Sequence, residues 1–320
     1  VALPAHPSPG AVGAPRGDGA SLSKRASFFG PKIHPVGALE MLQITRVILA
    51  SSALSVASLA TAGWNSPSID GAPTVDLGGD EWLLSAWHGP GAQNCSAGVK
   101  CTVPGDMYTD LWKEKVITDP MGPYGDHETA WAGRTSWSYK RQFSKAELDR
   151  TLGAGADIML VAEGLETNAT VLINGEQVMS ADNMWVRYTV PVTKLVQPGN
   201  NMLEVRFHSV FDECEFSNPK ISNRTCPNRV YVRQSASSWG WDWVNRYSPQ
   251  GIWRPIYFAG IQPGSAAITS LSTTAKPTNP AASADKTPWS VEARVTLQRS
   301  TAQDASVEGT VRVCGEWAGA

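Results

Sequence analysis

The feature that most constrains the fold is a series of short runs in which large apolar side chains alternate with polar ones. Ser136–Phe143, Ala169–Ile173 and Asn201–His208 follow this pattern. Alternation with a period of two is typical of strands that bury one face. The pair Asn174-Gly175 separates two such runs, and Asn-Gly in that position is the strongest short-range signal of a β-hairpin.

Two further runs complete the series. Asp157–Glu163 is almost wholly apolar, which predicts a buried strand, and Ile252–Phe258 follows near the end. Helical periodicity is confined to residues 108–115 and 145–151. Many short strands divided by Gly, Pro and Asn predict an all-β fold, a β-sandwich or jelly roll, over residues 81–261.

A second domain is indicated further along the chain. After a stretch rich in Pro, Ala, Ser and Thr at residues 273–288, alternation returns at 289–297 and 306–313. These runs predict the opening strands of an immunoglobulin-like sandwich, a fold that needs about seven strands and about 100 residues. We therefore expect residues 262–320 to form an incomplete immunoglobulin-like sandwich, and the chain to be a fragment of a longer protein.

The longest apolar run, residues 47–62, follows Met41 and Arg46 and ends in small residues. This layout is typical of a secretory signal peptide over residues 41–62, and the alternative is a buried, alanine-rich helix. A membrane span needs about 20 mainly apolar residues, whereas this run is shorter and interrupted by Ser and Thr. We expect no membrane span, a linker over 63–80, and disorder over the Pro- and Gly-rich residues 1–40, which we do not expect in the mature protein.

Other features agree with export. Asparagine acceptor sequences for glycosylation begin at Asn94, Asn168 and Asn223. We therefore expect a secreted protein, or one of a lysosome-like or vacuole-like compartment. Lys+Arg 27 against Asp+Glu 29 gives a net charge of −2, which provides no general field for phosphate backbones, so we expect no nucleic-acid partner.

The five cysteines fit an oxidising compartment. Connectivity cannot be deduced from sequence, but the short loops suggest bridges Cys95–Cys101 and Cys214–Cys226, with Cys314 unpaired. There is no Cys-x-x-Cys, and the five histidines are scattered. We expect neither a metal nor another cofactor.

Tryptophan is unusually frequent, with 13 residues against 7 Phe and 7 Tyr. Trp239, Trp241 and Trp243 are spaced by two, so in an extended strand they would share one face, with Asp242 on the other. Indole faces stack on the C–H faces of sugars, and an acid between two of them can accept hydrogen bonds from sugar hydroxyls. The same pattern also describes a tryptophan-filled core strand with a solvated aspartate.

A set of motifs in a fixed order resembles the β-mannosidases of glycoside hydrolase family 2. The motifs are Val103-Pro-Gly-Asp-Met-Tyr-Thr-Asp-Leu, Ile117-Thr-Asp-Pro, Gly125-Asp-His-Glu, Trp137-Ser-Tyr-Lys-Arg-Gln-Phe, Glu163-Gly-Leu-Glu-Thr-Asn-Ala-Thr, Asp182-Asn-Met-Trp, Gly199-Asn-Asn-Met-Leu-Glu-Val, Gly240-Trp-Asp-Trp and Gln250-Gly-Ile-Trp-Arg-Pro. Any one of them is a weak signal, whereas the ordered set is specific.

The resemblance implies a sugar-binding-type (galactose-binding-like) jelly-roll β-sandwich over residues 81–261, followed by an immunoglobulin-like sandwich and then a (β/α)8 barrel. It implies that Trp241 and Asp242 contact a terminal mannose, although this chain has Val244-Asn245 where the family usually has Gly-Pro. The two catalytic carboxylates of this retaining family would lie on the barrel, so we expect no catalytic residue here. The chain would be the N-terminal portion of a β-mannosidase acting on oligosaccharides and glycoproteins. Its partners would be a β-mannoside and the missing C-terminal barrel.

Alternatives remain open at this point. The chain could be a non-catalytic carbohydrate-binding jelly roll, or part of a family 2 hydrolase that acts on another β-glycoside, and whether it is an enzyme by itself stays undecided. Asp106 and Asp110 fall about one helical turn apart, and Asp212, Glu213 and Glu215 cluster around Cys214. Neither group indicates a catalytic pair, because no sequence feature predicts a pocket that raises one pKa.

Overall fold

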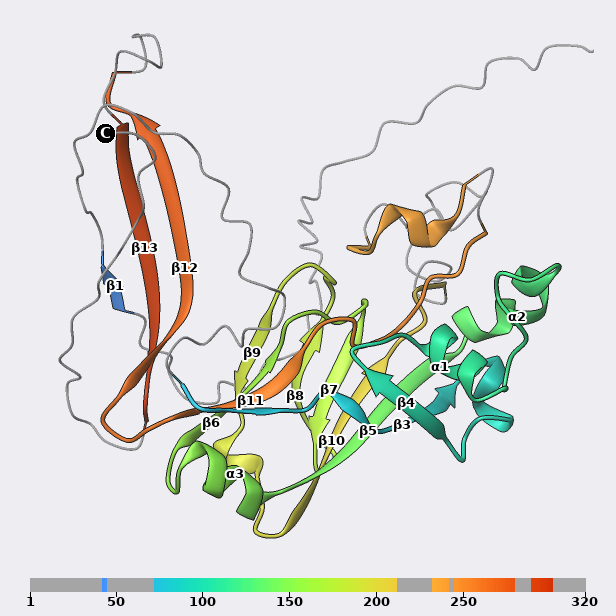
Figure 1. Ribbon diagram of the computed structural model, residues 1–320, viewed down its shortest axis with the longest axis horizontal. Coiled ribbons are helices and arrows are strands. Elements are labelled where there is room, and N and C mark those ends of the chain that lie inside the picture. Colours follow the sequence, from blue (N-terminus) through green and yellow to red (C-terminus); the bar gives the residue numbers. More distant parts are fainter. Residues whose placement is uncertain (1–41, 45–71, 212–231, 242–244, 280–288, 302–320) are drawn as a thin grey trace, which may run out of the picture. The chain divides into compact units, whose positions relative to one another are not determined.

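Two antiparallel sheets pack face to face in the computed structural model (Figure 1), which describes residues 42–44, 72–211, 232–241, 245–279 and 289–301. The six-stranded sheet has the order β4 (Val99–Val103), β3 (Gly79–His88), β5 (Ser136–Ser144), β10 (Asn200–Phe207), β7 (Ala169–Ile173) and β8 (Glu176–Ala181). The four-stranded sheet has the order β2 (Thr74–Asp76), β11 (Ile256–Ile261), β6 (Asp157–Ala162) and β9 (Tyr188–Pro191). The predicted all-β jelly-roll sandwich is confirmed.

The core lies between the two sheets because alternate residues of each strand point inward. Tyr139 and Val205 of the six-stranded sheet are fully buried and share one hydrophobic cluster with Leu160 of the four-stranded sheet. The rings of Phe143 and Phe258 join the sheets directly, with centroids 4.8 Å apart. β6 is buried on both faces, which is why its sequence is an unbroken apolar run.

The β7–β8 hairpin forms at the predicted Asn174-Gly175 turn. Asn174 has φ 53° and Gly175 φ 83°, as a two-residue turn with both central residues left-handed requires. The Asn174 side chain donates to Leu195 O (3.0 Å) and Asn201 Oδ1 (2.8 Å) and accepts from Met202 N (2.9 Å). The turn therefore also ties β10 and η2 (Thr193–Leu195) to the hairpin.

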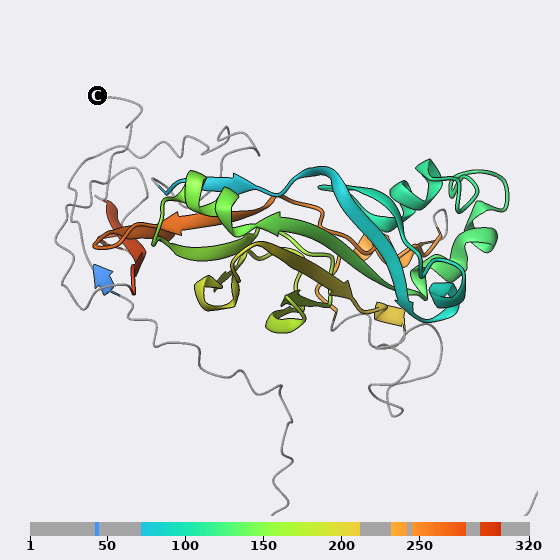
Figure 2. The same cartoon turned by 90° about the horizontal axis from the view of Figure 1, so that it is seen from below.

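Helices occupy both ends of the sandwich, with α3 at the opposite end from α1 and α2 (Figures 1 and 2). α1 (Met107–Lys113) and α3 (Lys145–Leu152) match the two predicted helical stretches. α2 (Gly125–Gly133) was not predicted. Its buried residues are mainly small, so no amphipathic stripe marks it in the sequence.

The expected domain limits differ from the observed elements in three places. β2 lies within the predicted linker 63–80 and pairs with β11, so the sandwich begins before Glu81. β12 (Ala266–Pro277) extends into the Pro/Ala/Ser/Thr-rich stretch and pairs with β13 (Trp289–Arg299). β1 (Leu42–Ile44), within the predicted signal peptide, pairs with β13. The run 306–313 and the rest of residues 1–71 lie outside the described residues, so the signal peptide and the immunoglobulin-like domain remain predictions.

The predicted Cys95–Cys101 bridge is absent, and both residues are free, buried thiols. Cys101 pairs with Trp82 of β3, whereas the Cys95 carbonyl accepts from Ala86 N. These partners lie four positions apart along β3, which corresponds to roughly 13 Å of strand. A disulfide needs Cα atoms within about 7 Å. Cys214, Cys226 and Cys314 lie outside the described residues.

Candidate functional site

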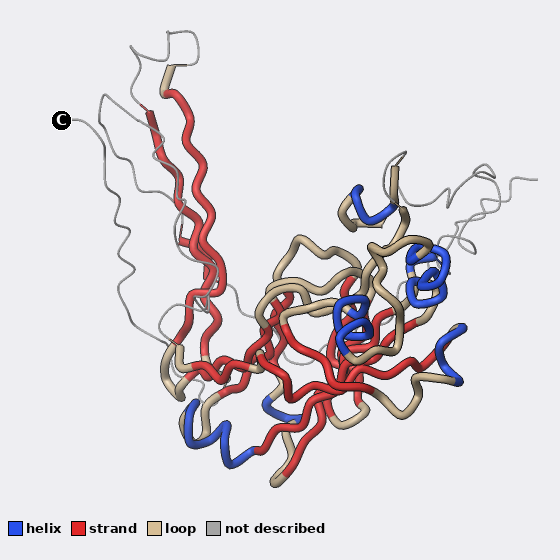
Figure 3. Tube along the Cα trace, turned by 45° about the vertical axis from the view of Figure 1, so that its right-hand side comes forward, coloured by secondary structure: helices blue, strands red, loops and turns tan. Residues whose placement is uncertain are grey.

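The segment that carries Trp241 lies at the end of the sandwich that bears α1 and α2 (Figures 1 and 3). It begins with η4 (Ala236–Trp239), a 3₁₀-helix. Trp239 is 3% exposed and packs edge-on against Phe211, with ring centroids 5.6 Å apart. Trp241 is 63% exposed.

The prediction that Trp239 and Trp241 share one face is therefore wrong. Period two places residues on one face only in an extended chain, whereas residues 236–239 are helical and Gly240 has φ 76°. One indole is thus directed into the core and the other into solvent. Asp242 and Trp243 lie outside the described residues.

The two described arms of this loop are joined at its base. Ser248 N donates to Ser238 O at 3.0 Å, and Gln234 Nε2 donates to Pro249 O at 3.1 Å. Met184 N donates to Arg233 O at 3.1 Å from the neighbouring 182–187 segment. The exposed indole is consequently carried on a base with defined backbone contacts.

Glu166 lies at the same base, in the connection between β6 and β7. Its side chain is buried, and its carboxylate accepts from Gln234 Nε2 (2.9 Å) and Ser238 Oγ (3.3 Å). Burial raises the pKa of Glu166 to about 7, and the two hydrogen bonds only partly oppose this. The sequence-based prediction did not include this residue, and no short-range signal in the sequence marks it, because its burial depends on the distant loop that folds over it.

The other arm is held against α1 through Gln250. Its carbonyl accepts from Met107 N (3.0 Å) and Tyr139 Oη (3.2 Å), and its Nε2 donates to Thr135 O (2.8 Å). Gly105 N donates to Ile252 O at 2.9 Å. Residues 250–252 are thereby fixed on both sides.

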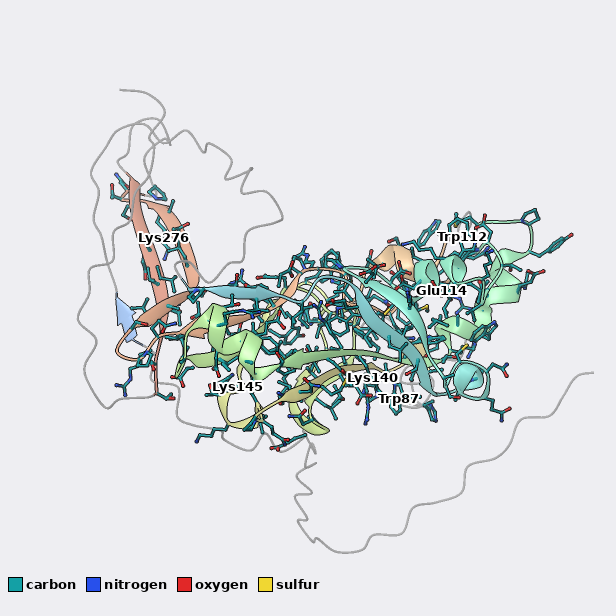
Figure 4. The ribbon with its side chains drawn as sticks, turned by 60° about the horizontal axis from the view of Figure 1, so that its bottom comes forward. Trp87, Trp112, Glu114, Lys140, Lys145 and Lys276 are labelled. Carbon is teal, nitrogen blue, oxygen red and sulfur yellow. The ribbon has the colours of Figure 1, made fainter. Side chains whose placement is uncertain are left out.

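Aromatic side chains connect this arm to the loop before α2. Tyr247 Oη donates to Pro120 O (2.6 Å), and Tyr108 Oη donates to Tyr247 O (3.0 Å). The two tyrosine rings meet edge-on with centroids 5.4 Å apart. Trp112 of α1 is also exposed at this end (Figure 4).

The acids Asp106 and Asp110 have structural contacts. Asp106 caps α1 by accepting from Tyr108 N (2.9 Å) and Thr109 N (3.2 Å). Asp110 is 2% exposed and accepts from Thr102 N at 3.2 Å. Burial raises the pKa of Asp110 to about 6, contrary to the expectation that nothing here would raise one, but an enclosed carboxyl cannot reach a substrate. Asp212, Glu213 and Glu215 lie outside the described residues.

A second polar cluster lies on the outer face of the six-stranded sheet. Glu204 accepts from Ser138 Oγ (2.6 Å) and Arg206 Nε (2.9 Å), and Lys140 Nζ lies 3.5 Å away. Burial alone would raise the pKa of Glu204, but these groups outweigh it and hold the pKa below its usual range. Trp87 is 40% exposed on the same face as Lys140 (Figure 4).

Of the predicted glycosylation sites, Asn94 is exposed at the end of η1 (Pro90–Gln93) and Asn168 is half-buried next to β7. Asn223 lies outside the described residues, and modification of all three remains a prediction. Within the described part of the chain, no group of three His, Cys, Asp or Glu side chains could hold a metal ion. No helix described there is long and apolar enough to cross a membrane.

Comparison with known proteins identifies the sandwich. The family described as "Glycosyl hydrolase 2 galactose-binding domain-like" matches residues 85–254. Beta-mannosidase B of Aspergillus clavatus is 32% identical over 161 residues, which is 48% of this chain and 19% of that protein. The beta-mannosidase of Bos taurus is 29% identical over 178 residues, which is 51% of this chain and 20% of that protein.

A solved structure agrees. The beta-D-mannosidase of Dictyoglomus thermophilum has a TM-score of 0.54 and 26% identity, covering 64% of this chain and 24% of its own. The chain belongs to the glycosyl hydrolase 2 galactose-binding domain-like family. The resemblance to family 2 β-mannosidases is confirmed, and the chain spans about a fifth of the length of these curated relatives.

Proposed function

We propose that this chain is the N-terminal portion of a β-mannosidase, in which the jelly roll forms one wall of the subsite for a terminal β-linked mannose. The observation that carries the proposal is Trp241, an indole 63% exposed on a loop whose base is fixed to the sandwich. An exposed indole offers a flat apolar face on which the C–H face of a sugar ring can stack. The relatives named β-mannosidase support mannose as the sugar.

The chemistry of the reaction assigns sugar binding to the jelly roll and bond cleavage to a different domain. Retaining glycosidases use two carboxyl groups about 5–5.5 Å apart, one as nucleophile and one as acid and base. In this proposal both lie outside the chain, on a C-terminal barrel of the same protein. Trp241 would support one face of the mannose ring, and Asp242 would accept hydrogen bonds from its hydroxyls, which fixes the sugar for attack.

Replacing Asp242 in the complete protein tests the proposal. We expect Asp242→Ala to lower kcat/KM for an aryl β-mannoside more than tenfold, since a hydrogen bond to a charged group is worth about 1.5–3 kcal/mol. Trp241→Ala should give a loss of similar order. Trp87→Ala is the matched control, because Trp87 is also an exposed indole, at 40%, but lies on the outer face of the six-stranded sheet. Wild-type kinetics in Asp242→Ala would contradict the proposal.

The finer expectations on export belong to the same proposal. A signal peptide over residues 41–62 and glycans on Asn94, Asn168 and Asn223 would place the protein in the secretory pathway, in a secreted, lysosome-like or vacuole-like location. N-terminal sequencing of the secreted product should begin after Ala62. Removal of N-glycans should lower its apparent mass.

A carbohydrate-binding role without hydrolysis is the second candidate. It is favoured by the exposure of Trp241 in this chain alone and by the galactose-binding-like family match. Calorimetric binding of mannosides by the 320-residue chain would support this role. Turnover of another β-glycoside by the complete protein, in preference to mannoside, would indicate a different family 2 specificity.

A further inference from the structure

Glu166 makes contacts with both arms of the loop that carries Trp241. Its carboxylate accepts from Gln234 and Ser238 of the first arm. Its backbone N and O pair with O and N of Gly251 in the second arm, at 2.9 and 3.1 Å. One residue of the β6–β7 connection is thus bonded on both sides of the loop base.

The surroundings of the Glu166 carboxylate leave it dependent on these hydrogen bonds. Glu166 is 7% exposed, and none of the ion pairs found among the described residues includes it. A buried carboxylate without a cation depends on its hydrogen-bond donors for stability. Gln234 Nε2 extends the link, because it donates both to Glu166 and to Pro249 O of the second arm.

We infer that Glu166 is a positioning residue: by holding the arm 234–238 against the arm 248–251, it sets the direction in which Trp241 meets the sugar. The part of this inference that concerns the sugar rests on the proposed function, whereas the part that concerns the loop geometry does not. Glu166 is enclosed and so does not touch substrate. Its effect reaches the sugar through the loop.

Hydrogen exchange in the 320-residue chain tests the geometry without any substrate. We expect Glu166→Ala to speed amide exchange in residues 234–241 and 248–252 about tenfold or more, with exchange in β5 unchanged. Glu166→Gln should stay within about twofold of wild type, because its amide oxygen still accepts from Gln234 and Ser238. Glu163→Gln is the matched control: Glu163 begins the same connection, but its carboxylate pairs with Arg187 (2.8 Å).

Two milder variants keep the test decisive if Glu166→Ala does not fold. Ser238→Ala and Gln234→Ala each remove one donor to the carboxylate and should each speed exchange in the same two segments. Unchanged exchange in these segments in all variants that fold would overturn the inference.

Kinetics of the complete protein give the second measurement. Glu166→Ala should lower kcat/KM for an aryl β-mannoside about tenfold, and Glu166→Gln should restore most of it, whereas Glu163→Gln should match wild type. If Glu166→Gln is as impaired as Glu166→Ala, the hydrogen-bonding role is wrong. If the wild-type protein hydrolyses no β-mannoside, the proposed function fails, and the exchange experiment still decides the role of Glu166.

Discussion

Glu166 and Gly251 exchange two backbone hydrogen bonds, with N···O distances of 2.9 and 3.1 Å, although neither residue belongs to a strand of the two sheets. On its other side, Gly251 lies against the backbone of Gly105 and Asp106. The β6–β7 connection, the second arm of the loop and the start of α1 are therefore stacked in direct contact. Three segments far apart in sequence form the base of the candidate site.

This stacking predicts that Gly251 cannot be enlarged. A Cβ there would lie 2.8 Å from Asp106 Cα and would also collide with the Gly105 carbonyl oxygen. We expect Gly251→Ala to lower the free energy of unfolding by about 2–3 kcal/mol, as overpacking against backbone does. Urea unfolding measures this. Gly78→Ala is the control, since its nearest atoms are 3.3 Å away and a small shift relieves them, and equal losses in the two variants would contradict the steric explanation.

The buried carboxyls predict a stability that falls as pH rises. Burial raises the pKa of Asp110 to about 6 and that of Glu166 to about 7. Between about pH 4 and pH 7 the folded chain therefore binds more protons at these groups than the unfolded chain, so their contribution to stability is present in acid and is lost on approaching neutrality. The expected loss is on the order of 2 kcal/mol per carboxyl.

Other groups act in the opposite direction, so the test compares variants. Glu204, with its lowered pKa, and His208, whose pKa burial lowers, both favour the folded state as pH rises. Between pH 5 and pH 8 the wild type should lose about 2 kcal/mol of unfolding free energy that Glu166→Gln, which has no proton to lose, should keep. Measured by urea unfolding, the stability of the variant relative to wild type should therefore rise by that amount. Glu176→Gln is the control, because Glu176 is exposed. A difference from wild type that does not change with pH would argue against a proton bound at Glu166.

Local physics explains why the strands could be predicted. Alternation identified β5 and β10, and Asn174-Gly175 identified the β7–β8 turn, because each signal depends only on neighbouring residues. The Trp241 region was predicted less well. The spacing of Trp239 and Trp241 is informative only if the backbone is extended, and Gly240 breaks that condition.

Contacts between distant segments could not be predicted from the sequence. Cys95 and Cys101 are close in sequence but pair with different parts of β3. Glu166 is distinctive only once the loop from Gln234 to Gly251 is seen to fold over it. Both outcomes depend on tertiary register, which short-range patterns do not encode.

The free thiols give a third prediction. Burial raises the pKa of both Cys95 and Cys101, which leaves little thiolate to react. We expect a maleimide to label neither residue in the folded chain and both in urea, without any reductant. Peptide mapping of the non-reduced protein provides the readout. A cross-linked peptide joining Cys95 to Cys101 would show that the register between β3 and β4 is wrong.

The hairpin turn gives a fourth prediction, in which two contributions can be separated. Asn174→Ala loses the three side-chain hydrogen bonds to Leu195, Asn201 and Met202, and it also places alanine at φ 53°. A left-handed non-glycine residue costs about 1–2 kcal/mol, and each hydrogen bond about 1 kcal/mol. We expect a total loss of about 4–5 kcal/mol in urea unfolding.

Asn174→Gly separates the two contributions, because glycine adopts the positive φ without strain but lacks the side-chain contacts. It should therefore be about 1 kcal/mol more stable than Asn174→Ala and still less stable than wild type. Gln177→Ala, on the exposed side of β8, is the control and should change stability by less than about 0.5 kcal/mol. If Asn174→Gly is as stable as wild type, then the contacts from this turn to η2 and β10 contribute nothing, and the turn stabilises the hairpin through its backbone alone.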